Sequence, residues 1–138
     1  MRSISRGGLA LLVLATLGLA ACDNTVNDLP NTPTPNPTTE TFSGAIGVNG
    51  AATHAFIVQA TGSVTATLTT VSPEDAVASL AVGTWNGAAC QVVLVNDNAL
   101  KGNAITGTVA GLGTLCIRVA DAGKLVGSTD YTVTVLHP

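Results

Sequence analysis

The sequence predicts an all-β domain over residues 42–138, a small two-sheet antiparallel sandwich of about eight strands. Apolar and polar residues alternate there in short runs such as Val64-Thr65-Ala66-Thr67-Leu68, which is the period-two pattern of a strand with one buried face. No window of roughly 11 residues has a convincing 3.6-residue apolar period. Turn signals rich in glycine and asparagine, such as Asn49-Gly50 and Asn86-Gly87, separate the runs.

Eight runs in this region have strand character. The expected strands cover residues 42–48, 54–60, 63–71, 76–84, 89–95, 104–109, 114–120 and 130–136. The stretch from Gln91 to Val95 is apolar on both faces, which predicts a central strand covered on both sides. The threonine-rich strands are expected at outer positions, because threonine suits a solvated pleat.

The first 21 residues have the regions of an export signal. Arg2 and Arg6 supply positive charge, and the apolar run Leu9–Leu19 is shorter than the about 20 residues that span a bilayer. The run ends in Leu19-Ala20-Ala21-Cys22, which resembles the lipobox of bacterial lipoproteins. The resemblance implies cleavage after residue 21, a lipid on Cys22, and a place in the cell envelope, on the periplasmic or extracellular side of a membrane. An ordinary secretory peptide with an incidental cysteine is the alternative.

Residues 22–41 are expected to be the lipidated N-terminus and a tether. Prolines alternate there with threonines and asparagines, and Leu29 is almost the only large apolar side chain. Such a segment cannot bury enough apolar surface to offset its chain entropy, so we expect disorder with polyproline II character.

Two cysteines remain in the domain. Cys90 and Cys116 fall in expected strands of an exported domain, where an oxidising compartment permits disulfides. A bridge between them is expected to stabilise the fold by about 3 to 4 kcal/mol on the chain-entropy model. Two buried, reduced thiols are the alternative.

Several segments resemble the bacterial pre-peptidase C-terminal domain. Residues 42–44, 54–58 and 62–68 are similar to the opening of that domain, and residues 113–119 and 130–135 are similar to its late strands. The resemblance implies a jelly-roll-like sandwich that usually accompanies secreted enzymes and assists secretion, folding or substrate contact.

Few residues suit catalysis or metal binding. His54 and His137 are too few for zinc, which takes three or four protein ligands, and no serine lies in a Gly-x-Ser-x-Gly elbow. The turns Glu74-Asp75 and Asn96-Asp97-Asn98 offer oxygen ligands, but neither has the ligand density of a calcium loop. We therefore expect no enzymatic activity, no metal site and no cofactor besides the lipid, with bound calcium as the alternative.

Charge and aromatic content narrow the expected partners. After residue 21 the chain has three basic and eight acidic residues, which gives a net charge of −5. Binding to nucleic acid requires positive charge, so this charge has the wrong sign for it. Phe56 and Tyr131 are expected in the core. Trp85 and Asn86 are the candidate ligand contacts, because Trp85 lies beside a turn; a role in capping the end of the sandwich is the alternative for Trp85.

Two functions fit these features. The first is a membrane-anchored, non-enzymatic envelope module that contacts a protein or a surface polymer. The second is an accessory that acts in trans on a separate secreted peptidase or other exported enzyme, in substrate contact, folding or secretion. We expect a monomer in either case.

Overall fold

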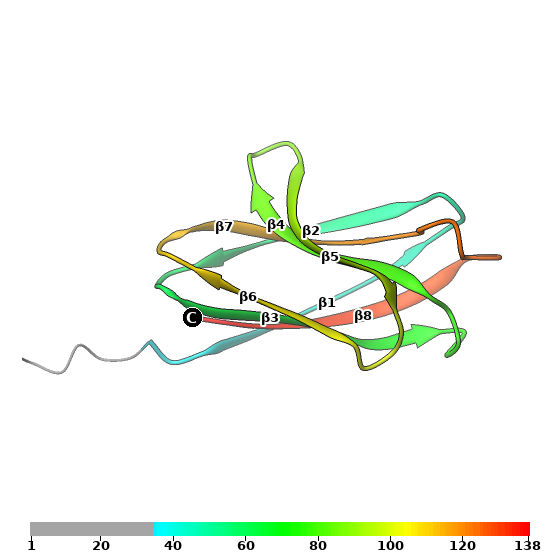
Figure 1. Cartoon of the computed structure of the whole chain (residues 1–138), viewed down its shortest axis with the longest axis horizontal. Coiled ribbons are helices and arrows are strands. Elements are labelled where there is room, and N and C mark those ends of the chain that lie inside the picture. Colours follow the sequence, from blue (N-terminus) through cyan, green and yellow to red (C-terminus); the bar gives the residue numbers. More distant parts are fainter. Residues whose placement is uncertain (1–34) are drawn as a thin grey trace, which may run out of the picture. The chain divides into compact units, whose positions relative to one another are not determined.

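The computed structural model describes residues 35–138, so the expected export signal, Cys22 and most of the expected tether lie outside the described residues. The described residues form two four-stranded antiparallel sheets packed against each other, which confirms the predicted β-sandwich (Figure 1). The strands are β1 (Thr38–Ile46), β2 (Ala51–Val58), β3 (Gly62–Ser72), β4 (Ala78–Trp85), β5 (Cys90–Ala99), β6 (Ala104–Val109), β7 (Gly113–Ala120) and β8 (Thr129–His137). Within residues 35–138, no helix has the length and apolar character needed to cross a membrane.

The strand order is that of a jelly roll. One sheet has the order β1-β8-β3-β6 and the other has the order β2-β7-β4-β5. The chain therefore changes sheet at every connection except the one between β4 and β5. Interleaving of this kind is how an eight-stranded double sheet closes around a core.

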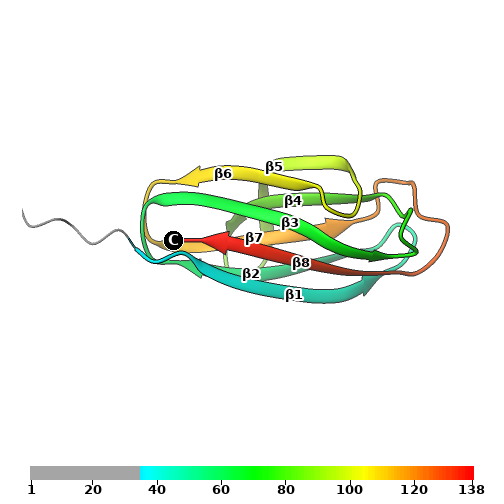
Figure 2. The ribbon, with the colours of Figure 1, turned by 90° about the horizontal axis from the view of Figure 1, so that it is seen from below.

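The connections gather at two opposite ends of the sandwich, except the one between β4 and β5. At the first end β1 begins, β8 finishes, and the connections 59–61 and 110–112 turn the chain (Figure 2). Thr38 pairs with His137 and Gly62 pairs with Val109, which fixes this arrangement. We name this end the tether end, because the chain enters the domain there. The connections 47–50, 73–77, 100–103 and 121–128 form the far end.

The core lies between the two sheets and is filled by alternate residues of the inner strands. Leu68 and Val133 come from one sheet, and Leu80 and Ile117 from the other; all four are fully buried. Alternation thus predicted the inward faces correctly, because a strand can present only every second side chain to one side. Phe56 and Tyr131 are buried, as expected.

The first strand begins earlier than the sequence indicated. Residues 38–41, assigned to the tether, belong to β1 and pair with the last residues of β8, with Glu40 opposite Val135. The ladder satisfies their backbone groups, and threonine has a high strand propensity, so pairing overrides the proline-rich composition just before them.

The predicted central position of residues 91–95 is wrong. They lie in β5, an edge strand that pairs only with β4, and Val93 is 70% exposed. The strand covered on both faces is β4, which is buried from Ala78 to Gly83. An apolar run carries no information on which strand will pair with it, so composition alone could not separate these two cases.

The predicted outer position of the threonine-rich strands is also wrong for β3. This strand lies between β8 and β6 inside its sheet. Its threonines instead line the outward face of the sheet, where Thr65 Oγ1 lies 3.0 Å from Thr106 Oγ1 of the neighbouring strand. A solvated pleat is thus a property of one face and does not require a sheet edge.

Candidate functional site

An apolar cleft of about 370 Å³ opens between the two sheets beside the tether end. It lies between β5 and β6, the edge strands of different sheets, so no backbone ladder closes the gap between them. Its walls come from the ends of β2, β3, β4 and β7 as well as from these two edges. The lining residues are Val58, Val64, Val82, Gly83, Thr84, Val93, Leu94, Gly107, Thr108, Val109, Ala110, Gly111, Leu112, Gly113, Thr114 and Leu115.

Leu94 and Gly107 set the shape of this cleft. Leu94 of β5 reaches across to β6, where a Cβ on residue 107 would lie 2.7 Å from Leu94 Cδ1. The missing side chain at Gly107 therefore allows Leu94 to approach the opposite sheet. One leucine partly closes the gap between the sheet edges, and the remainder stays open to solvent.

The chemistry of the lining is apolar. Its side chains are those of valine, leucine and alanine, with three threonines as the polar groups, and none of the lining residues is titratable. A concave site of this size and composition suits apolar groups of a ligand or partner.

Three large apolar side chains around this end of the sandwich are more than half exposed. Leu112 in the β6–β7 connection is 79% exposed, Val93 in β5 is 70% exposed, and Ile57 near the end of β2 is 62% exposed. Val93 is the extra residue of a bulge, since Val82 pairs with Leu94 and Gly83 with Val92. A bulge re-aims a side chain away from the regular pleat, which accounts for the exposed position of Val93.

Of the predicted contact residues, Trp85 ends β4 and Asn86 begins the β4–β5 connection, which stands away from the other loops (Figure 1). Trp85 is half-buried and follows Thr84 of the cleft wall. Asn86 is exposed, but its Oδ1 accepts the backbone N–H groups of Ala88 and Ala89 at 2.9 and 2.8 Å. The side chain of Asn86 thus builds the turn, and Trp85 is not among the residues that line the cleft.

The predicted partners Cys90 and Cys116 lie at disulfide distance, with their sulfur atoms 2.10 Å apart and their Cα atoms 5.7 Å apart. They belong to β5 and β7, which flank β4. The start of β5 folds over the outer side of β4, where a Cβ on Gly83 would lie 2.1 Å from the carbonyl oxygen of Gln91. Glycine at position 83 therefore lets the two cysteines meet across β4.

The two histidines lie at separate sites. His54 Nε2 is 2.7 Å from the hydroxyl of Tyr131, and its ring stacks on Phe42 with centroids 5.1 Å apart. Burial lowers the pKa of His54 and raises the pKa of Tyr131. Gly44 makes room for this pair, because a Cβ there would lie 2.8 Å from the Tyr131 hydroxyl.

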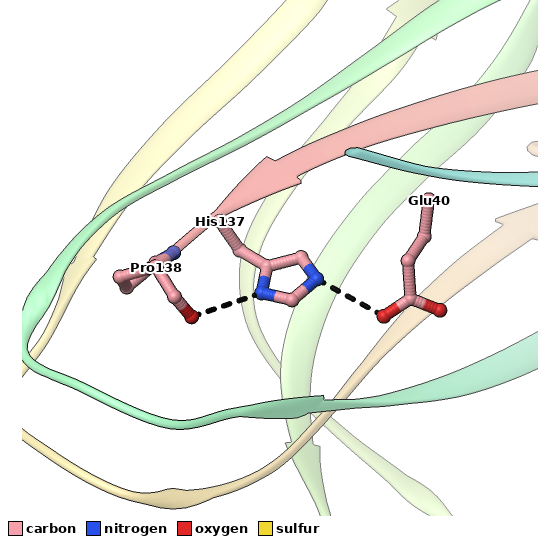
Figure 3. Close-up of polar contacts among 3 residues, drawn as sticks. All are labelled: Glu40, His137 and Pro138. Carbon is pink, nitrogen blue, oxygen red and sulfur yellow. Dashed lines mark hydrogen bonds and ion pairs between the residues drawn. The ribbon is translucent and has the colours of Figure 1, made fainter. Parts of the chain in front are cut away.

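His137 is buried at the tether end, between two oxygen atoms (Figure 3). Its Nε2 is 3.0 Å from Glu40 Oε1 and its Nδ1 is 3.1 Å from the carbonyl oxygen of Pro138. This contact joins the first strand to the last residue of the chain. Within residues 35–138, no three His, Cys, Asp or Glu side chains gather as metal ligands.

Lysine side chains contact both oxygen-rich segments that were expected to be turns and candidate calcium ligands. Glu74-Asp75 is a turn, but the prediction of a turn at Asn96-Asp97-Asn98 is wrong, because these residues lie in β5. Lys101 Nζ lies 2.6 Å from Glu74 Oε1. Lys124 Nζ contacts the carbonyl oxygen of Asp97 and Oδ1 of Asn98. Ammonium groups thus occupy oxygen atoms that a calcium ion at these segments would use as ligands.

Asp121 organises the far end, a role that was not predicted. Its carboxylate accepts backbone N–H groups from Asn49, Leu125 and Lys124, and these bonds lower its pKa to about 2. The carboxylate therefore joins the β1–β2 connection to the β7–β8 connection. The local sequence Asp121-Ala122-Gly123 is a turn signal that could have indicated such a residue.

No protein-family model matches this chain, and no curated protein matches it in sequence.

Proposed function

We propose that this chain is a lipid-anchored protein of a bacterial cell envelope and that its β-sandwich is a non-enzymatic binding module. The observation that carries the proposal is the motif Leu19-Ala20-Ala21-Cys22 at the end of the apolar run Leu9–Leu19. Two or more acyl chains on Cys22 would give stable anchoring, since each buried methylene contributes about 0.8 kcal/mol.

The apolar cleft supports the binding role. Leu112 and Val93 line it and remain largely exposed. Exposed apolar surface that is contiguous with a cleft is typical of an interaction site, because water is a poor environment for it. The threonines supply the few polar groups that orient what binds there.

The lining also supports a role without catalysis. General acid and base catalysis requires a side chain that exchanges protons near neutral pH, placed within hydrogen-bond reach of the reacting atom. Valine, leucine, alanine, glycine and threonine make up the lining, and none of them has this property. We therefore assign the cleft to binding.

Metabolic labelling with a palmitate analogue tests the anchor. We expect the wild-type chain to incorporate the label and Cys22→Ser to lose it. A double variant, Cys90→Ser with Cys116→Ser, is the matched control and should keep the label, because it removes two sulfur atoms and leaves the lipobox intact. An unlabelled wild-type chain, or label retained by Cys22→Ser, would contradict the proposal.

A further inference from the structure

We infer that the sandwich docks on the membrane that holds its own anchor, with the tether end and the apolar cleft against the lipid. The inference rests on the proposed lipid anchor and names the partner of the cleft, the apolar boundary of the bilayer. Three observations carry it: the point where the chain enters the domain, the position of exposed apolar side chains, and the distribution of charge.

The chain enters the domain at the same end as the cleft. Residues 22–34 connect the expected lipid site to the first described residue, and Thr38 starts β1 at the tether end. Thirteen residues span at most about 45 Å when fully extended. The tether end is thus held within a short distance of the surface, at a high local concentration, so contacts too weak to bind a free domain are sufficient.

Large exposed apolar side chains lie at both ends of the domain. Those of the far end, Val48, Leu100 and Val126, lie in the connections that also hold or adjoin its charged side chains, whereas the most exposed ones of the tether end lie beside the cleft and on β2. Leu112 belongs to a connection of the tether end, Val93 lines the cleft, and Ile57 is the last residue but one of β2. They come from three separate segments of the chain and are each more than half exposed. Apolar side chains presented together on one end can enter the headgroup and acyl boundary, as the apolar face of an interfacial helix does.

Charge is segregated to the other side of the domain. Of the acidic side chains in residues 35–138, only Glu40 lies near the tether end, and it is bonded to His137. The remaining charged side chains lie at the far end or on the strands leading to it, except Arg118 in the middle of β7. Glu74, Asp75, Lys101, Asp121 and Lys124 lie in connections of the far end, and Asp97 and Asp130 lie on strands within three residues of those connections.

This distribution favours contact at the tether end over any other orientation. Carboxylates are repelled by anionic lipid headgroups and lose hydration near hydrocarbon, so the far end is unsuited to the surface. An apolar protein partner would fit the cleft chemically. Such a protein would have to enter the space between the domain and the membrane that holds its proposed anchor. Lipid is therefore the better match for the cleft.

Fluorescence of the full lipidated chain in phosphatidylethanolamine and phosphatidylglycerol vesicles tests the docking. Leu112→Cys and Ala122→Cys place a single free thiol for an environment-sensitive dye on exposed connections at opposite ends, because Cys22 carries lipid and the other two cysteines are bonded. We expect the dye at position 112 to shift to shorter wavelength and to be quenched by nitroxide lipids. The dye at position 122 should remain in water.

A second variant separates docking from anchoring. Ile57→Asp combined with Val93→Asp changes two exposed positions and should lower quenching at position 112 to the level at position 122, while the protein still floats with the vesicles. If the chain without the two aspartate substitutions floats with the vesicles but its dye at position 112 is in water, the docking is overturned and the anchor is left intact. Protein that does not float would overturn the anchor, and the docking with it. Shielding of position 112 only after an envelope protein is added would overturn lipid as the partner.

Discussion

Replacing Gly83 with alanine tests the close passage of β5 over β4. The new Cβ would lie 2.1 Å from the carbonyl oxygen of Gln91 and 2.6 Å from its carbonyl carbon, both backbone atoms that cannot rotate away. Alanine in a strand ordinarily stabilises by about 0.5 to 1 kcal/mol relative to glycine. Overpacking costs about 1 to 3 kcal/mol, and a clash with backbone belongs at the upper end. We therefore expect a net loss of about 2 kcal/mol in the free energy of unfolding.

Urea and thermal unfolding of the Cys22→Ser chain, which lacks the proposed lipid site, measure this loss. For a domain of this size, about 2 kcal/mol lowers Tm by roughly 10 °C. Gly113→Ala is the matched control, since residue 113 lies in the same sheet, a Cβ added there would meet no atom within 4 Å, and its φ is not positive. It should be neutral or slightly stabilising. If Gly83→Ala unfolds like Gly113→Ala, the reasoning about this crossing is refuted.

The same substitution in a chain without the disulfide shows whether the bond holds β5 in place. When Cys90 and Cys116 are both serine, β5 can move away from β4 and relieve the clash with the alanine. We expect Gly83→Ala to cost about 1 kcal/mol less in that background, a coupling that a double-mutant cycle resolves. Equal costs in the two backgrounds would show that the disulfide does not constrain this passage.

Three further predictions concern stability. Converting Cys90 and Cys116 to serine should lower the free energy of unfolding by about 3.5 kcal/mol, the value that the chain-entropy model gives for a separation of 26 residues. Urea unfolding measures this loss, and unchanged stability would contradict the prediction. Burial lowers the pKa of His54 below 6.5, so the unfolded chain binds a proton more readily and stability falls as pH drops below 6.5. His54→Gln should remove this part of the pH dependence, and an NMR titration midpoint at or above 6.5 would disprove it. The pKa of Asp121 is about 2 in the fold, so Asp121→Asn should lower Tm at pH 7, by a difference that shrinks as pH falls from 3.8 through 2. A difference independent of pH would count against this role of the carboxylate.

The fold was predictable because its information is local. Alternation of Val64 and Leu68 with threonines marks a strand and its buried face without reference to any other strand. The cysteine pair was predictable for a similar reason, since only two cysteines remained in the domain. Sheet order depends on which strands pair, and an apolar run such as Val92 to Val95 is equally compatible with the centre and the edge of a sheet.

The candidate site was not predictable for the same physical reason. The cleft exists because β5 and β6 end up as edges of different sheets, which places Leu94 against Gly107. Neither residue is unusual in the sequence. Trp85 was singled out for its aromatic ring beside a turn. It follows the cleft residue Thr84 but does not line the cleft, and its contact with a ligand stays a prediction.

Thr38 and His137 pair, so the first and last strands finish side by side. A reporter fused after Pro138 would emerge next to the entering chain, at the tether end. Adjacent termini of this kind permit circular permutation. A permuted chain joined across this junction and opened between Ala122 and Gly123 would carry the proposed lipid at the far end. If the proposed anchor holds, this change inverts the module on the membrane and leaves the jelly roll unchanged.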